Sequence, residues 1–243
     1  MSTITLDNLT LTYQRHPAIH HVSGSFETGS MTAIVGPNGA GKSSLLKAIV
    51  GLMPPSGGHV RLQGCERRDI AYLPQSAEMD RSFPLSVMDC VLMGAWRTVG
   101  PFRSLGKAAQ RDALAALAAV GLSGFERRMI AELSAGQFQR VLFARVMVQD
   151  APVILLDEPF NAIDARTTAD LLTLVRRWHG EQRTIIAVLH DMEQVRLNFP
   201  RTLMVARELI GWGSTEETLT PANLSRARAR SEAWDDHADI CAA

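Results

Sequence analysis

Continuous apolar runs alternate along the chain with segments that have the periodicity of helices. The clearest strand-like runs are Val153–Leu156, Thr184–Leu189 and Leu203–Ala206. The clearest helix-like segments are Lys107–Val120 and Ala165–Trp178. Runs that are apolar at every position are typical of strands buried on both faces. The pattern therefore predicts an α/β fold with a largely parallel core sheet covered by helices.

Two regions depart from this alternation. Thr3–Glu27 alternates more strictly and carries turn residues, which predicts an antiparallel β edge. Between Gln75 and Gln149 the strand signal nearly vanishes, so a helical subdomain is predicted at about residues 76–149, inserted in the core. Residues 1–225 are interpreted as one domain, and residues 226–243 as a solvated tail in which arginines and acidic residues balance.

Composition excludes several classes of protein. The chain has 243 residues, enough for a sizeable core, and its 25 basic residues balance 25 acidic ones, so nucleic acid is not an expected partner. The three cysteines lie far apart and form no C-x-x-C pair, which indicates neither a disulfide framework nor a zinc knuckle. No signal peptide is recognised, and no apolar run approaches the ~20 residues needed to cross a bilayer. A soluble, cytoplasmic chain is expected.

Residues 36–43 read Gly-Pro-Asn-Gly-Ala-Gly-Lys-Ser, a complete G-x-x-x-x-G-K-[ST] phosphate loop between the apolar run Met31–Val35 and the helix-like run Ser44–Val50. The glycines let backbone N–H groups and the helix N-terminus face an anion. Lys42 supplies a charge to the β- and γ-phosphates, and the Ser43 hydroxyl suits Mg²⁺. The sequence therefore predicts a site for a nucleoside triphosphate and Mg²⁺. The residues expected to touch the nucleotide are Gly36, Pro37, Asn38, Gly39, Ala40, Gly41, Lys42, Ser43 and Ser44.

Two carboxylates, Asp157 and Glu158, directly follow the apolar run Val153–Leu156. Ligands of open α/β sheets sit at the carboxyl ends of the strands. An acid in this position needs a positive partner, so Asp157 is assigned to the Mg²⁺ shell and Glu158 to the deprotonation of the attacking water. The alternative is a strand that simply ends in polar residues.

Leu133–Gln137 opens the predicted helix Phe138–Val148. Ser134 and Gln137 have the spacing of a capping box, which is a structural interpretation. A helix N-terminus that carries Ser and Gly is also an anion site. The spacing alone leaves both interpretations open.

Taken in order, these motifs resemble the nucleotide-binding subunit of ATP-binding cassette (ABC) transporters. The resemblance covers about residues 3–220 and implies a P-loop NTPase domain that hydrolyses ATP with Mg²⁺. Its matching elements are Tyr13, Gly36–Ser43, Gln75, Leu133–Gln137, Val153–Glu158, Asp164 and His190.

The resemblance implies that two copies dimerise head to tail, so that Ser134, Gly136 and Gln137 of one copy complete the phosphate site of the other. It implies that Asp164 contacts the opposite subunit and that Tyr13 stacks on adenine. Gln75 would reach Mg²⁺ and the attacking water, and His190 the γ-phosphate; with Lys42 and Glu158 they form the expected catalytic set. Tyr13 could also be an ordinary strand aromatic, Gln75 a turn residue, and His190 the residue before a helix cap.

Two positions depart from the family pattern. Ala135 stands where glycine is usual, and it fits if the site requires a helical backbone there. The stretch Asn161–Asp164 is less common but keeps its acid.

Several segments resemble the ATPases of zinc and manganese importers. They are Ala71–Gln75, Phe83–Asp89, Val91–Gly94 and Val188–Met192, and the carboxyl part Asn198–Gly213 is similar to a zinc-type subgroup. The resemblance implies an ATPase that powers zinc uptake through a separate membrane permease, at the inner face of the cell membrane, with an extracytoplasmic metal-binding protein acting indirectly. Manganese and siderophore, haem or cobalamin importers remain alternatives, as do a soluble ABC ATPase and a P-loop kinase. Apolar residues of the insertion are expected to receive a permease helix in part, whereas His16, His20 and His21 lack the partners of a metal site.

Overall fold

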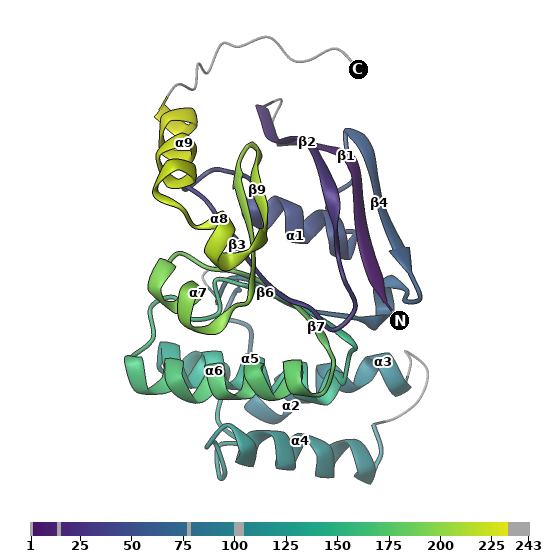
Figure 1. Ribbon diagram of the computed structural model, residues 1–243. Helices are drawn as coiled ribbons and strands as arrows, with labels where there is room; N and C mark the ends of the chain where they lie inside the picture. The colour runs from purple at the N-terminus through teal and green to yellow at the C-terminus, as the bar shows by residue number, and fades with distance from the viewer. Residues whose placement is uncertain (1, 14–15, 77–78, 100–104, 233–243) are drawn as a thin grey trace. The chain divides into compact units, whose positions relative to one another are not determined.

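The computed structural model describes residues 2–13, 16–76, 79–99 and 105–232 (Figure 1). Its internal contacts divide the chain into two compact units. Unit 1 consists of Met1–Arg67 and Thr184–Ala243, and unit 2 of Arg68–Arg183. The predicted α/β fold with a largely parallel core, an antiparallel edge and a helical insertion is confirmed, unit by unit, as follows.

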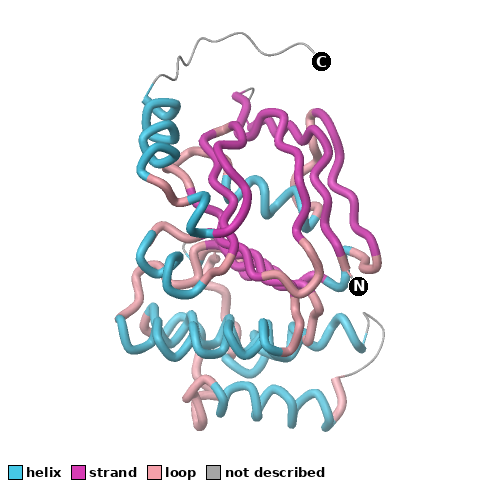
Figure 2. Tube along the Cα trace, in the orientation of Figure 1, coloured by secondary structure: helices cyan, strands magenta, loops and turns pink. Residues whose placement is uncertain are grey.

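Unit 1 contains a three-stranded antiparallel sheet in the order β2-β1-β4 (Figure 2). Its strands are β1 (Thr3–Tyr13), β2 (His16–Phe26) and β4 (Gly57–Gln63). Alternate side chains of β1, including Ile4 and Leu6, are buried, as the period-2 pattern requires. The predicted antiparallel edge is therefore correct, although β4 was not expected.

Unit 1 also contains the parallel strands that carry the phosphate loop. Strand β3 (Met31–Val35) pairs in parallel with β7 (Thr184–Val188) on one side and β8 (Arg201–Ala206) on the other, and β9 (Glu208–Ser214) adds to β8 in the antiparallel sense. Every residue of β3 and β7 is buried, which explains their uninterrupted apolar sequences. The helices of this unit are α1 (Lys42–Val50), α7 (Met192–Asn198), α8 (Thr215–Thr218) and α9 (Pro221–Glu232).

Unit 2 is mainly helical around one pair of parallel strands, β5 (Ile70–Leu73) and β6 (Val153–Asp157). Its α-helices are α2 (Val87–Leu92), α3 (Trp96–Val99), α4 (Lys107–Ala119), α5 (Ala135–Gln149) and α6 (Ala165–Gly180), and its short 3-10 turns are η1 (Arg67–Asp69), η3 (Met93–Ala95) and η4 (Ile130–Glu132). Within the described residues from Gln75 to Gln149, the only β feature is an isolated bridge between Ser86 and Met129, so the helical insertion is confirmed. Phe143 of α5 stacks on Trp178 of α6, with ring centroids 5.7 Å apart, and this pair forms part of the unit's core.

The carboxyl end continues as helix farther than the sequence pattern suggested. Helix α9 runs to Glu232, Ala227 is buried, and Arg230 forms an ion pair with Glu208 of β9. Residues 233–243 of the predicted tail lie outside the described part of the chain. The boundary between a domain of residues 1–225 and a tail remains a prediction.

In the described ranges, every helix is too short or too polar to reach across a lipid bilayer.

Candidate active site

The phosphate loop leaves the carboxyl end of β3 and is packed closely against other backbone of unit 1. A Cβ at Gly36 (φ 153°) would lie 1.9 Å from the carbonyl oxygen of Val205, and one at Gly41 (φ 85°) would lie 2.1 Å from that of Ala18. No side chain fits at either position. Gly39 (φ 76°) needs its backbone conformation but faces open space, and Asn38 beside it is exposed. The loop is therefore fixed on its inner side and open at its tip.

Helix α1 begins at Lys42, directly after this loop. Its N-cap is Gly41, which has no side chain to bind the first N–H groups, and its first turn carries no acidic residue. An uncapped helix N-terminus at the end of a glycine loop is a binding place for an anion. Ser43 and Ser44 lie half-buried in the first turn.

Lys42 holds the loop from within. Its side chain is buried, with 5% of the residue exposed, and its Nζ donates hydrogen bonds to the carbonyl oxygens of Gly36 (3.0 Å) and Pro37 (2.8 Å). A buried ammonium requires such partners, because its desolvation is otherwise unfavourable. The contacts bring its positive charge to the same loop whose N–H groups would face the phosphates.

His190 lies at the same edge of unit 1 as the phosphate loop. The N–H of Leu189 donates to the carbonyl oxygen of Ile34 (3.1 Å), so the chain leaving β7 runs beside the end of β3. His190 is exposed, and Asp191 after it caps α7 by accepting from the N–H groups of Glu193 and Gln194. His190 is thus the residue before a helix cap, on a chain that leaves β7 beside the end of β3. Its contact with the γ-phosphate stays a prediction.

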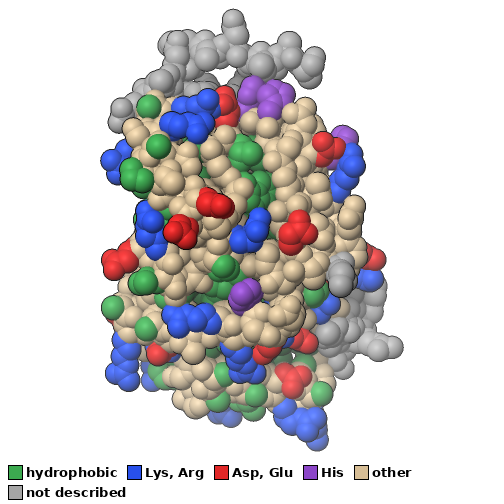
Figure 3. All heavy atoms as spheres, viewed as in Figure 1, with side chains coloured by type: hydrophobic (Ala, Val, Ile, Leu, Met, Phe, Trp, Pro, Cys, Tyr) green, Lys and Arg blue, Asp and Glu red, His purple; other side chains and the backbone are tan. Residues whose placement is uncertain are grey.

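Tyr13 ends β1, where its backbone pairs with His16, but its side chain lies outside the described part of the molecule. The stacking of Tyr13 on adenine stays a prediction. Histidine side chains gather on the three-stranded sheet of unit 1 (Figure 3), where the rings of His20 and His21 lie 4.3 Å apart and burial, with the charge of His21, lowers the pKa of His20. In the ranges that the structure describes, no three His, Cys, Asp or Glu side chains form a group suited to a metal ion.

In unit 2, the two carboxylates predicted from sequence end β6 in different environments. Asp157 is completely buried and accepts a hydrogen bond from the Tyr72 hydroxyl at 3.3 Å. Glu158 is half-buried and adopts a left-handed backbone conformation with φ 48°, which costs on the order of 1 kcal/mol for a residue with a side chain. The two adjacent carboxylates therefore differ in burial and in hydrogen-bond partners.

Gln75 meets Glu158 although 83 residues separate them, and its Nε2 donates to Glu158 Oε2 at 3.0 Å. The Nδ2 of Asn161 donates to the same oxygen at 3.1 Å. Two neutral amides thus fix the direction of the carboxylate without neutralising its charge. The structure therefore joins Gln75 to Glu158 and adds Asn161 and Tyr72, and sequence reasoning anticipated none of these contacts. The reach of Gln75 to Mg²⁺ and the attacking water stays a prediction.

These residues also provide suitable ligands for Mg²⁺, which prefers oxygen donors and retains several of its waters. Asp157 offers a buried carboxylate at a strand end, and Ser43 a hydroxyl in the phosphate loop. Because Gln75 uses its nitrogen toward Glu158, its Oε1 is the atom left for a metal ion. Each of these oxygen groups is of the kind that Mg²⁺ prefers, and their joint role as ligands stays a prediction.

Ser134 caps α5 with a complete capping box. The N–H of Gln137 donates to Ser134 Oγ (3.2 Å), and the N–H of Ser134 donates to Gln137 Oε1 (3.0 Å). Ala135 is the first helical residue, so the alanine sits where helix favours it, which satisfies the condition set by the sequence. The structural interpretation of this motif is correct, and its exposed position at a helix N-terminus also keeps the anion interpretation open.

Gly136 and Asp164 lie close together in unit 2. A Cβ built at Gly136 would stand 3.7 Å from Asp164 Oδ2 and from Thr167 Oγ1, an ordinary contact, and its φ is not left-handed. The fold of this chain alone therefore does not require a glycine here. Asp164 caps α6 by accepting from the N–H (2.9 Å) and hydroxyl (2.8 Å) of Thr167, and these bonds lower the pKa of its carboxyl group.

Comparison with known proteins places these motifs in a family. The ABC transporter family model matches residues 19–161. The zinc transport system ATP-binding protein TroB of Treponema pallidum (strain Nichols) is 41% identical over 228 residues, covering 92% of this chain and 86% of the relative. The manganese transport system ATP-binding protein MntB of Listeria monocytogenes serovar 1/2a is 39% identical, covering 91% of this chain and 94% of the relative.

Solved structures agree with these relatives. A metal-chelate type ABC transporter in an inward-facing conformation has a TM-score of 0.83 at 28% identity and covers 94% of this chain and 90% of that one. A bacterial ABC transporter cassette solved as a dimer has a TM-score of 0.77 at 27% identity and covers 87% and 98% of the two chains.

Proposed function

Because this chain belongs to the ABC transporter family, we propose that it is the ATPase subunit of a bacterial importer that takes up a divalent metal ion, zinc in the first place, through a separate membrane permease. It is an ATP-binding cassette, and its hydrolysis of ATP is coupled to transport. The observation that carries the proposal is the orientation of Glu158 by Gln75 and Asn161, in a chain that also carries a complete phosphate loop.

Nucleotide binding is assigned to unit 1. The phosphates lie against the N–H groups of residues 36–44, Lys42 adds its charge, and Tyr13 stacks on the base. Ser43, Asp157 and Gln75 would hold a magnesium ion, which would neutralise the phosphate charge that develops during transfer. Lys42 is already buried against the loop carbonyls, so little reorganisation is needed when the nucleotide arrives.

Hydrolysis is assigned to Glu158 as general base. Its carboxylate takes a proton from the attacking water, and the two amide donors keep one of its oxygens directed while the other is turned toward the water. His190, beside the phosphate loop at the end of β7, contacts the γ-phosphate. The leaving ADP and inorganic phosphate need no covalent intermediate with the protein.

A second copy of the chain completes the site. Gly136 has room for a side chain within its own fold, so its lack of one is consistent with close approach by something outside the chain. Ser134, Gly136 and Gln137 at the N-terminus of α5 meet the phosphates bound by the other copy, and Asp164 meets its surface. The related cassette solved as a dimer supports this arrangement.

The contact surface for the permease is assigned to the exposed apolar side chains of the helical insertion. Phe83 (63% exposed), Trp96 (60%) and Met93 (36%) belong to one segment of unit 2 and are the kind of surface that a partner helix covers. Through this partner the chain is held at the inner face of the cell membrane, and the permease receives its metal from an extracytoplasmic binding protein.

Manganese is the second candidate cargo, because relatives named as manganese transport proteins are nearly as similar as the zinc relative. Reconstitution in liposomes with the permease and binding protein encoded beside the gene tests both ions. Uptake of radioactive zinc that depends on ATP, exceeds uptake of manganese and stops in Glu158→Gln supports the proposal. Manganese uptake alone would reassign the cargo, and ATP hydrolysis that no metal stimulates would refute metal import.

A further inference from the structure

The segment of residues 79–85 holds the peptide in front of Ser134. Arg81, on this segment, donates from Nη2 to the carbonyl oxygens of Leu133 and of Ile130, the latter at 3.1 Å. Leu133 immediately precedes Ser134. A guanidinium is always charged, so these bonds to backbone oxygens are charge-assisted and stronger than those between neutral groups.

The peptide between Leu133 and Ser134 is fixed on both sides. Arg81 binds its carbonyl oxygen, and its N–H donates to Gln137 Oε1 at 3.0 Å. Because a peptide unit is planar, fixing both polar groups fixes the orientation of the whole plane, and with it the direction of Ser134. The same guanidinium lies over the ring of buried Phe138, 4.9 Å from its centroid. Arg81 therefore contacts residues immediately before and after the stretch Ser134–Gln137.

We propose that Arg81 is a positioning residue for ATP hydrolysis, which directs Ser134 and the first turn of α5 toward the nucleotide of a second copy. The proposal rests on the dimeric ATPase proposed above. Arg81 acts through the Leu133–Ser134 peptide and touches no nucleotide itself.

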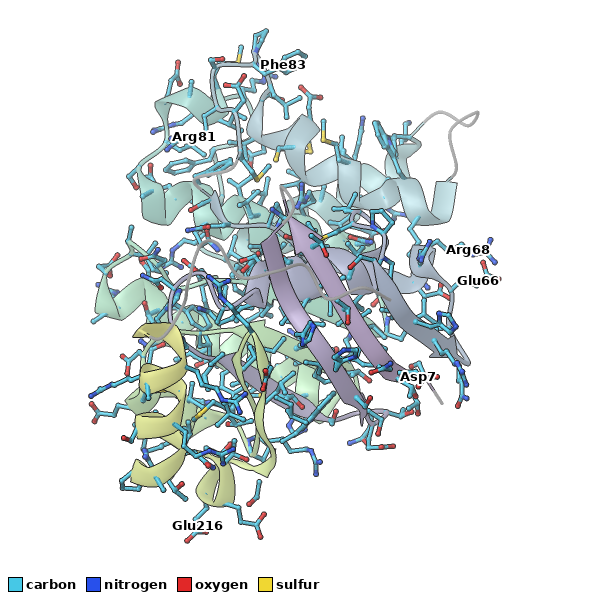
Figure 4. All side chains as sticks on the ribbon, turned by 90° about the horizontal axis from the view of Figure 1, so that it is seen from above. Asp7, Glu66, Arg68, Arg81, Phe83 and Glu216 are labelled. Carbon is cyan, nitrogen blue, oxygen red and sulfur yellow. The ribbon has the colours of Figure 1, made fainter. Side chains whose placement is uncertain are left out.

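The position of Arg81 also connects Ser134 to the surface assigned to the permease. Arg81 and the exposed Phe83 lie on one segment of unit 2 (Figure 4), and the backbone just after them is bonded to the same region: Ile130 N–H donates to Leu85 O at 3.0 Å. A displacement at Phe83 would thus reach Ser134 through Arg81.

Arg97 provides a matched control, because it belongs to the same insertion and holds the opposite end of the same helix. It donates to the carbonyl oxygens of Asp150 (2.8 Å) and Gln149 (3.4 Å) at the end of α5, and it pairs with Asp69 at 3.0 Å. Arg97 thus stabilises α5 as Arg81 does, but far along the helix from Ser134.

The test compares Arg81→Gln and Arg97→Gln, each in full-length chain that also carries Glu158→Gln, so that hydrolysis does not deplete the dimer. Sedimentation velocity measures the ATP concentration for half-maximal dimerisation, and a fluorescent ATP analogue measures binding to the monomer at low protein concentration. Loss of the two charged hydrogen bonds should raise the half-maximal ATP concentration roughly tenfold in Arg81→Gln. Monomer binding should stay within about twofold, since the phosphate loop is intact. Arg97→Gln should lower the melting temperature but change neither the ATP concentration for half-maximal dimerisation nor the affinity of the monomer for the ATP analogue.

Arg81→Lys is the conservative variant, which keeps a charged donor but loses the planar guanidinium over Phe138. Arg81→Lys should show a smaller increase in the ATP concentration for half-maximal dimerisation than Arg81→Gln, and it takes the place of Arg81→Gln if that variant fails to fold. A folded Arg81 variant that dimerises at the ATP concentration of its parent overturns the proposal, as does an equal shift in Arg97→Gln. If the Glu158→Gln parent stays monomeric at saturating ATP, the dimeric mechanism itself is refuted and the role of Arg81 falls with it.

Discussion

Replacement of Glu158 by glutamine should separate ATP binding from hydrolysis. The amide donors of Gln75 and Asn161 converge on the same carboxylate oxygen, at 3.0 and 3.1 Å. The carbonyl oxygen of a glutamine can take that position and accept both hydrogen bonds, while its NH₂ group occupies the place of the other oxygen. The substitution therefore preserves the shape of the site and removes the basic oxygen.

The magnitude follows from this geometry. General base catalysis contributes about 10²- to 10⁴-fold to the rate, and the variant should lose about that factor in kcat. Because the phosphate loop belongs to unit 1 and is untouched, the affinity for ATP should stay unchanged. The accumulated ATP-bound form should be dimeric.

Phosphate release at saturating ATP measures the rate, titration calorimetry the affinity, and gel filtration with ATP the dimer. Asn161→Ala is the matched control: it keeps the base but removes one of its two orienting bonds, so its kcat should fall far less. Turnover by Glu158→Gln at a tenth of the wild-type rate or more would show that Glu158 is not the base.

Three further outcomes are expected. Lys42→Ala removes a buried charge and the hydrogen-bond donor of the Gly36 and Pro37 carbonyl oxygens. Calorimetry should therefore find ATP binding weakened at least roughly 30-fold, and an unchanged affinity would contradict the phosphate-loop assignment. Gly136→Ala should melt at the wild-type temperature, because the nearest atoms to its Cβ would lie 3.7 Å away, an ordinary van der Waals contact. Its ATPase rate should nevertheless fall roughly tenfold through the second copy's site, and a normal rate would remove the argument for close approach. The folded-state pKa of Asp164 lies below its unfolded value, so its contribution to stability is present above about pH 4 and is lost as the pH falls through the folded pKa. Chemical denaturation from pH 6 to pH 2.5 measures the free energy of unfolding at each pH. This free energy should fall less steeply with acid in Asp164→Asn than in wild type, and an equally steep fall in both proteins would refute the linkage.

The sequence was most informative where one short segment determines both structure and chemistry. Met31–Val35 and Val153–Asp157 are buried at every position, so their apolar letters alone predict strands and place the following residues at a sheet edge. The phosphate loop was predictable because its residue types mark it in sequence, and Gly36 and Gly41 have positive φ angles and no room for a Cβ.

Elements that depend on distant partners were missed. Strand β4 is half-exposed and contains Gly57 and Gly58, so it lacks the apolar run of a buried strand and is held by pairing with β1. Helix α9 is rich in arginine, and its buried Ala227 and the pairing of Arg230 with Glu208 are tertiary contacts that no local pattern reveals.

In the candidate site, sequence reasoning singled out Asp157, Glu158 and Gln75 but did not anticipate the hydrogen bonds that they make. Asn161 lies three residues after Glu158 and was considered only as part of an unusual stretch. Glutamate rarely adopts a left-handed backbone conformation, so the positive φ of Glu158 could not be predicted from residue propensity. Such a conformation persists only where the surrounding structure holds it in place.

The hydroxyl group of Ser134 shows why the two sequence interpretations of its motif do not exclude each other. Its oxygen lone pair is occupied by the amide of Gln137, an intramolecular contact that exists in a single chain. The hydroxyl group can also donate a hydrogen bond, and a phosphate oxygen of a bound nucleotide can accept it without disturbing the start of the helix. The same hydroxyl group can thus cap the helix in the monomer and bind phosphate in the assembly, because the two hydrogen bonds can exist at the same time.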